Sequence, residues 1–207
     1  MPHADASLVP TTITTKSQFW DHVHSQLGYL LDGQRHWITN LANASSLIYH
    51  SLLAFPAHFG SGDRTVNWCG FYLHSSLFPD PKFIGSGESN QRYVSRNEDK
   101  LLLGPFCGKP ACQFIDLGTG KTPGVCADAF IHKQTVVVRD VHSYPGHIAC
   151  DGETNSEIVC PLVYKGSNGS IVVGVLDLDC LAPSGFDEDD QVGLERITRL
   201  IAQMCEW

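Results

Sequence analysis

Hydrophobic positions along the chain change their spacing twice. A helical period near the N-terminus gives way to strand-like runs in the middle and returns near the C-terminus. Apolar residues three and four apart predict helices over 17–31 and 37–50, and a last helix that ends at about Met204. Ser17 is the expected N-cap of the first helix, and Gly33 fits its C-terminal cap. The pattern therefore predicts helices at both ends of one folded unit.

The middle of the chain is rich in β-branched and aromatic residues that are separated by turn signals. Strands are expected at 66–74, 101–105, 135–139, 156–164 and 170–180. The first of these runs carries apolar groups on both faces, which indicates a central position in a sheet. A short helix is expected over 124–133. Residues 75–100 are polar and without periodicity, which predicts a surface insertion.

Length and composition favour a single globular domain. The chain has 207 residues, of which 43% are hydrophobic and 17% are charged, a profile typical of a compact protein. Residues 1–15 are polar and are expected to form a flexible tail, and 16–207 are expected to form one domain. No internal repeat and no linker divides that domain.

The charge balance narrows the classes of partner. The formal net charge is -8, which argues against nonspecific binding to nucleic acid or to an anionic membrane. The N-terminal residues lack the basic start and apolar core of a signal peptide. No apolar run approaches the roughly 20 residues that span a bilayer. We therefore expect a cytoplasmic protein, with the nucleus also allowed.

Candidate chemistry gathers in residues 144–161, which read YPGHIACDGETNSEIVCP. Here Cys150 lies near several acids, among them Glu153 and Glu157. A thiol beside acids can act as a nucleophile with proton donors nearby. The alternative is a surface loop with a half-buried cysteine that serves only in packing. None of the eight cysteines forms a C-x-x-C pair, so a zinc ribbon and a thioredoxin-type motif are not indicated.

Three further residues are candidates for a site. Asp177 and Asp179 share one face of an otherwise apolar strand, either as site acids or at a solvated sheet edge. Cys126 falls in the first turn of the expected 124–133 helix, where the helix N-terminus would lower the pKa of its thiol. Trp68 is either an ordinary core residue or the wall of a pocket for a small apolar group.

One apparent nucleotide motif is rejected. Residues 118–124, GTGKTPG, superficially resemble a phosphate-binding loop, but the position that needs the first glycine holds Ile115. Pro123 also interrupts the helix that such a loop would begin.

Six runs together resemble a known family. They occur in this order: NWCGFY at 67–72, LGPFCGKPACQ at 103–113, GVC at 124–126, the 144–161 stretch, GVLDLDC at 174–180 and GFDEDD at 185–190. The chain is similar to the free methionine-(R)-sulfoxide reductases, which are single GAF-domain enzymes. The resemblance extends from Trp37 to Met204, and its most specific part is IACDGETNSEIV.

The resemblance implies a fold, an activity and a set of residues. The fold would be α+β, with a central antiparallel sheet and the N- and C-terminal helices packed on one face. The activity would be reduction of free L-methionine-(R)-S-oxide to methionine, without an organic cofactor or a metal. The family pattern makes Cys150 the nucleophile, Cys112 and Cys126 the other motif cysteines, and Trp68 the pocket tryptophan. Its pocket acids match Glu157, Asp177 and Asp179. A homodimer is also implied.

The implied chemistry uses these residues in sequence. The thiolate of Cys150 attacks the sulfoxide sulfur, and one of the three acids supplies a proton to the oxygen. Methionine leaves, and the resulting sulfenic acid condenses with a second thiol to a disulfide that thioredoxin reduces. Cys112 is the expected partner, because the segment near Gly108 and Pro110 can move. Cys126 remains the alternative as partner or as nucleophile.

The chain also departs from the family pattern, and other functions remain open at this point. Cys107 and Cys160 are additional cysteines, and residues 75–100 and the KTPG segment are longer than usual. The main alternative function is a noncatalytic GAF sensor that binds a small molecule. A zinc-dependent interaction protein is a third class, which the cysteine spacing disfavours.

Overall fold

The computed structural model describes residue 5 and residues 8–60, 62–79, 98–118, 124–147, 151–167 and 169–207. Within these residues the helices are α1 (Lys16–Leu30), α2 (Trp37–Leu53), α3 (Val125–His132) and α4 (Glu188–Met204). The strands are β1 (Val66–His74), β2 (Lys100–Gly108), β3 (Phe114–Asp116), β4 (Val136–Val138), β5 (Ser156–Gly166) and β6 (Gly169–Cys180).

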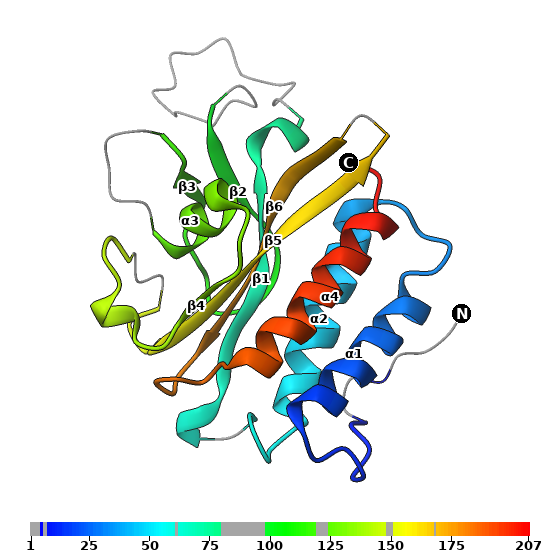
Figure 1. Cartoon of the computed structure of the whole chain (residues 1–207), viewed down its shortest axis with the longest axis vertical. Coiled ribbons are helices and arrows are strands. Elements are labelled where there is room, and N and C mark those ends of the chain that lie inside the picture. Colours follow the sequence, from blue (N-terminus) through cyan, green and yellow to red (C-terminus); the bar gives the residue numbers. More distant parts are fainter. Residues whose placement is uncertain are drawn as a thin grey trace, which may run out of the picture.

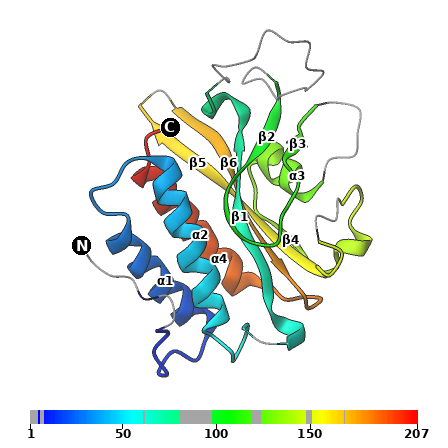
Figure 2. The same ribbon diagram turned by 180° about the vertical axis from the view of Figure 1, so that it is seen from behind.

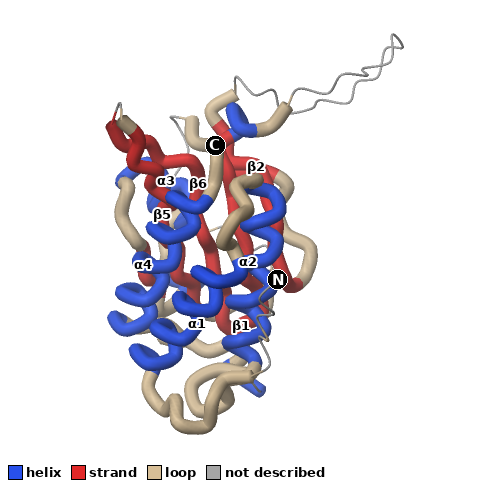
Figure 3. The backbone as a smooth tube through the Cα atoms, turned by 90° about the vertical axis from the view of Figure 1, so that its right-hand side faces the viewer, coloured by secondary structure: helices blue, strands red, loops and turns tan. Residues whose placement is uncertain are grey.

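One antiparallel sheet organises the molecule. Its six strands lie in the order β3-β2-β1-β6-β5-β4, and each neighbouring pair is antiparallel. The helices α1, α2 and α4 lie on one side of the sheet and α3 lies on the other (Figures 1 and 2). Figure 3 looks onto the layer of three helices, with the strands behind it. The expected α+β fold with terminal helices on one face is confirmed.

The alternation of side chains along the strands builds a separate apolar cluster on each face. Cys69, Phe71 and Leu73 of β1 belong to the core beneath the three helices. Trp68 and Tyr72 belong to a second cluster, on the face that α3 covers. Both apolar faces of β1 are therefore buried, and β1 has a strand on either side in the sheet, as the sequence predicts.

The helix ends correct two details of the sequence interpretation. Thr15, not Ser17, caps α1, because Thr15 and Gln18 form a reciprocal capping box. The C-cap of α1 is Leu31, and Gly33 follows two residues later with φ +76°.

A buried ion pair joins the two helices at opposite ends of the chain. The Lys16 ammonium of α1 contacts the carboxylate of Asp190, whose side chain is fully buried in the first turn of α4. The indole N–H of Trp20 donates to the other oxygen of Asp190 at 2.9 Å. This network fixes α1 against α4, on the side of the sheet away from the pocket described below.

Two sequence predictions fall partly outside the described residues. Most of the insertion expected at 75–100 lies there, although Ser75–Leu77 forms a short 3₁₀ turn. Part of the expected 1–15 tail lies there as well. In the described part of the chain, no helix has both the length and the apolar character that crossing a membrane requires.

Candidate active site

A pocket with a volume of about 120 Å³, open to solvent, lies on the face of the sheet that α3 covers. Its floor comes from β1, β5 and β6, and its walls come from β3 and the segment before it, the start of α3 and the loop before β5. Six predicted site residues line it: Trp68, Cys112, Cys126, Glu157, Asp177 and Asp179. The remaining one, Cys150, lies outside the described residues.

The register of the sheet brings the acids together. Glu157 of β5 is paired with Asp179 of β6, and Asp179 is paired with Trp68 of β1. Asp177 lies two residues along β6, on the same face. Since β6 has strands on both sides, the alternative of a solvated sheet edge is wrong. Glu157 and Asp177 are buried, 5% and 6% exposed, so these carboxyl groups lie in an apolar setting.

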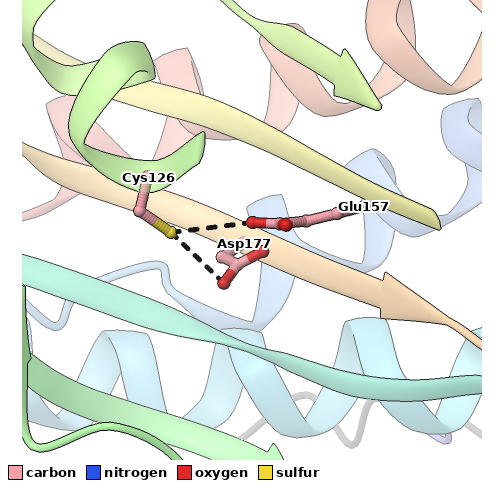
Figure 4. A group of neighbouring side chains, drawn as sticks. All are labelled: Cys126, Glu157 and Asp177. Carbon is pink, nitrogen blue, oxygen red and sulfur yellow. Dashed lines mark hydrogen bonds between the residues drawn. The ribbon is translucent and has the colours of Figure 1, made fainter. Parts of the chain in front are cut away.

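Cys126 meets two of these acids at the start of α3. Its Sγ lies 3.4 Å from Oδ2 of Asp177 and 3.9 Å from Oε1 of Glu157 (Figure 4). The sulfur and the two carboxylate oxygens all lie within 4.8 Å of one another. The thiol donates to Asp177, whose other oxygen, Oδ1, is buried and has no hydrogen-bond partner among the described residues.

Burial and mutual repulsion set the protonation of the cluster. Burial, followed by the nearby Asp179, raises the pKa of Glu157 well above its usual range. Burial, followed by Glu157, raises the pKa of Asp177 in the same way. Burial, followed by Asp177, also raises the pKa of Asp179. At least one carboxyl group can therefore stay protonated near neutral pH and donate a hydrogen bond.

The prediction of a low pKa for Cys126 is wrong. Burial, then the acids Asp177 and Glu157, raises the pKa of this thiol well above its usual value. Cys126 does lie in the first turn of α3, as the sequence predicts. The partial positive charge of a helix N-terminus is small beside desolvation and two carboxyl groups in contact. Cys126 is thus a protonated thiol at neutral pH.

Trp68 and Tyr72 form the aromatic wall of the pocket. Their ring centroids are 5.9 Å apart and their planes are inclined by 24°. Gly70, between them on β1, makes room for the indole: a Cβ there would lie 2.5 Å from Cη2 of Trp68. The sequence interpretation named Trp68 and missed Tyr72, although the strand period puts both on one face.

His147 is a second residue that the sequence interpretation did not include in the site. Its Nε2 lies 3.4 Å from Oε2 of Glu157, and its side chain is largely shielded. Burial lowers the pKa of His147, which favours the neutral imidazole at neutral pH. A histidine in the loop between β4 and β5 carries no local sequence signal that its side chain will contact an acid at the start of β5.

The thiol of Cys126 and the carboxyl groups of Glu157 and Asp177 lie close enough together to share a metal ion. A metal-bound cysteine must lose its proton, and the acids must be ionised. In the metal-free protein burial raises the pKa of all three groups, so the cluster as described can donate protons and hydrogen bonds. The expectation that the reaction needs no metal stays a prediction.

The fold and the pocket define a GAF-domain protein with thiols and acids at its ligand site. The GAF domain family model matches residues 65–204. The chain is 42% identical over 176 residues to the free methionine-R-sulfoxide reductase of Saccharomyces cerevisiae, covering 85% of this chain and 79% of that protein. The Escherichia coli protein of the same name is 34% identical, covering 91% of this chain and 88% of that one.

A solved structure extends the comparison to a liganded protein. The free methionine-R-sulfoxide reductase of Neisseria meningitidis, in complex with its substrate, matches with a TM-score of 0.70 and 30% identity. The match covers 96% of this chain and 95% of that one. The chain belongs to the free methionine-R-sulfoxide reductase family of GAF-domain proteins. Family membership therefore favours an oxidoreductase over the alternative of a noncatalytic sensor.

Proposed function

We propose that this protein reduces free methionine-(R)-sulfoxide to methionine by thiol chemistry. The observation that carries the proposal is the buried cluster of Glu157, Asp177 and Asp179 beside cysteines and beneath an aromatic wall. Family membership identifies the substrate class, and the acids supply what sulfoxide reduction needs, a proton for the oxygen.

Substrate binding uses both walls of the pocket. The face of Trp68 packs against the ε-methyl group of the substrate. Of the three acids, an ionised one binds the ammonium group. Gly124, Val125 and Cys126 line the pocket, and the first backbone N–H groups of α3 have no side-chain cap. They are suited to the substrate carboxylate. A substrate with a blocked amine lacks the charge that the acids recognise.

The chemical step needs a thiolate and an acid. The thiolate of Cys150 attacks the sulfoxide sulfur while a protonated carboxyl group of the cluster protonates the oxygen. Methionine departs, and the oxygen and the added proton remain on Cys150 as a sulfenic acid. Cys150 is the proposed nucleophile because Cys126, the other candidate, is buried against two acids that disfavour its thiolate.

The second half-reaction restores the enzyme. Cys112 on the pocket wall attacks the sulfenic acid, a disulfide forms and water leaves. An external dithiol of the thioredoxin type then reduces the Cys112–Cys150 bond. The cytoplasm, the proposed location, supplies such a dithiol. The proposed assembly is a homodimer, which light scattering after size exclusion would test.

The decisive experiment separates the two epimers of the substrate. Purified protein with dithiothreitol should release methionine from the R epimer only, and N-acetylmethionine-(R)-sulfoxide should react at least about 100-fold more slowly. Cys150→Ser should release no methionine. Equal turnover of both epimers would refute the proposal that this pocket binds the substrate. A stoichiometric methionine burst from Cys150→Ser would identify Cys126 as the nucleophile instead.

The acids are tested by isosteric variants. Glu157→Gln and Asp179→Asn should each lower turnover by about 100-fold or more with the fold intact, because proton delivery contributes about that much. Asp32→Asn, a change at an exposed acid between α1 and α2, is the matched control. Wild-type rates in both site variants would refute the role of the acids as proton donors.

A further inference from the structure

The segment of residues 109–112 carries Cys112 and lies in the connection between β2, which ends at Gly108, and the short strand β3, which begins at Phe114. It begins directly after Gly108, which has φ +128°, a conformation that favours glycine. A Cβ at Gly108 would lie 2.7 Å from the carbonyl oxygen of Asn67 and 2.7 Å from Cδ1 of Trp68. The segment therefore leaves β2 by a sharp turn that is pressed against β1.

Two buried aromatic residues hold the two ends of this segment. The indole Nε1–H of Trp68 donates to the carbonyl oxygen of Lys109 at 3.1 Å. The hydroxyl of Tyr72 donates to the carbonyl oxygen of Cys112 at 3.0 Å. Trp68 and Tyr72 are only 4% and 2% exposed, so water competes poorly for these hydrogen bonds. The pocket wall and the Cys112 segment are thus one connected unit.

An ion pair adds a third attachment on the outer side. The Lys109 ammonium lies 3.2 Å from Oδ2 of Asp151, and it also contacts Glu153. Asp151 accepts a further hydrogen bond from the Asn67 side chain at 3.1 Å. Lys109 is more than half exposed, so this pair contributes less than the two buried hydrogen bonds.

We propose that Tyr72 is a positioning residue for the second thiol of the reaction. Its hydroxyl holds the backbone of Cys112 at the pocket wall and so limits how far the Cys112 thiol can move away from the pocket during turnover. The inference rests on the proposed function. The step it serves is the attack of the Cys112 thiol on the sulfenic sulfur of Cys150, which forms the S–S bond and releases the sulfenic oxygen as water. The hydroxyl of Tyr72 serves this step, whereas its ring belongs to the wall of the substrate pocket.

Tyr72 can be separated from Trp68 by substitution. Tyr72→Phe keeps the ring that forms the pocket wall and removes only the hydroxyl that reaches Cys112. The Cys112 backbone then loses its anchor, and the thiol spends less time at the pocket. One hydrogen bond of this kind corresponds to a change of about five- to tenfold in the rate of the step that depends on it.

The experiment follows one turnover without reductant, with saturating methionine-(R)-sulfoxide. Tyr72→Phe should still release one methionine per active site, and any change in the rate of that release should be smaller than the change in the rate of disulfide formation. Its disulfide, followed by nonreducing mass analysis, should form about five- to tenfold more slowly. A dimedone trap should capture correspondingly more sulfenic acid. Tyr164→Phe, a change on β5 at the helix-covered core, is the matched control and should behave as wild type.

Two further measurements distinguish positioning from a general structural effect. The slowing caused by Tyr72→Phe should be smaller with dithiothreitol, which reduces the sulfenic acid directly, than with thioredoxin, which acts on the disulfide. In a Cys112→Ser background, Tyr72→Phe should change neither the methionine burst nor the amount of trapped sulfenic acid. An effect that persists in that background would show that Tyr72 acts elsewhere.

The outcomes also separate this inference from the proposed function. If wild type releases no methionine, the proposed function fails. If wild type releases methionine and Tyr72→Phe forms its disulfide at the wild-type rate, only the role of Tyr72 is refuted. Equal slowing of methionine release and disulfide formation would also refute it, because Tyr72 would then act on substrate binding or on the pocket as a whole.

Discussion

Asp177 should make the protein less stable at neutral pH, and Asp177→Asn should therefore stabilise it while impairing turnover. The carboxyl group is buried, and its Oδ1 has no hydrogen-bond partner within the described residues. Burial and the neighbouring Glu157 raise its pKa above the ordinary value of 3.8. At neutral pH the unfolded chain ionises this group freely, whereas the folded chain must keep it protonated or bury a charge.

The sign of the pH dependence follows from proton binding. Between the ordinary pKa and the raised pKa of Asp177, the folded state binds more protons than the unfolded state. The free energy of unfolding therefore falls as the pH rises through that window, and the contribution of Asp177 is most favourable below pH 3.8. An asparagine cannot ionise, so Asp177→Asn does not lose stability in this way as the pH rises.

Two opposing contributions set the change in the free energy of unfolding that Asp177→Asn causes. A buried Oδ1 without a hydrogen-bond partner costs about 1–3 kcal/mol, and more when the group is charged. The new amide N–H group must find an acceptor, which offsets about 1 kcal/mol. We expect a net gain of about 1–2 kcal/mol near pH 7, or a rise in Tm of about 2–8 °C for a chain of this size.

Urea unfolding at several pH values between 5 and 8 measures the difference directly. The gap between Asp177→Asn and wild type should widen as the pH rises, and the exposed control Asp32→Asn should show no such trend. Turnover of Asp177→Asn should fall although stability increases, a trade-off common at functional sites. A variant that is less stable than wild type at pH 7, or a gap that does not depend on pH, would refute the reasoning.

Two other substitutions test the fold around the site. Lys16→Met should lower the free energy of unfolding, measured in urea, by about 3–5 kcal/mol, because it leaves Asp190 buried without its cation. The double variant Lys16→Met/Asp190→Asn should recover part of this stability. If it recovers none, the ion pair is not the cause of the loss. Gly70→Ala should cost about 1–3 kcal/mol and raise KM, because its Cβ would lie 2.3 Å from Cβ of Phe106 and displace Trp68; an unchanged KM would contradict the role of Trp68 in the pocket.

The sequence predicts the elements well because their signals are local. The bounds of β1 follow from one apolar run between turn residues, and the structure begins and ends that strand where the pattern does. The cap of α1 is also readable: Thr15 and Gln18 have the spacing of a capping box, whereas Ser17 lies inside the first turn. The prediction of Ser17 as N-cap is wrong because it considers only that serine is a common capping residue. It does not ask whether a glutamate or glutamine follows three residues later, as Gln18 follows Thr15.

The protonation of the site could not be predicted from local signals. The position of Cys126 at a helix N-terminus suggests a lowered thiol pKa. Its pKa is instead raised, because the thiol is buried and because Asp177 of β6 and Glu157 of β5 lie beside it. Tyr72 and His147 were missed for the same reason. Their partners, the carbonyl of Cys112 and the carboxyl of Glu157, reach them only through the fold.

Strand β6 shows how one short run of sequence serves both stability and chemistry. Leu176 and Leu178 point into the core beneath the helices, and Asp177 and Asp179 point into the pocket on the other face. Neighbouring substitutions should therefore have opposite effects on stability. Leu178→Ala should lower the free energy of unfolding by about 2–5 kcal/mol, because it empties part of a fully buried core position. Asp177→Asn should raise it. At temperatures where Leu178→Ala stays folded, its turnover should remain close to wild type, because the leucine faces away from the pocket. Loss of turnover in the folded Leu178→Ala protein would show that the two faces of the sheet are not independent.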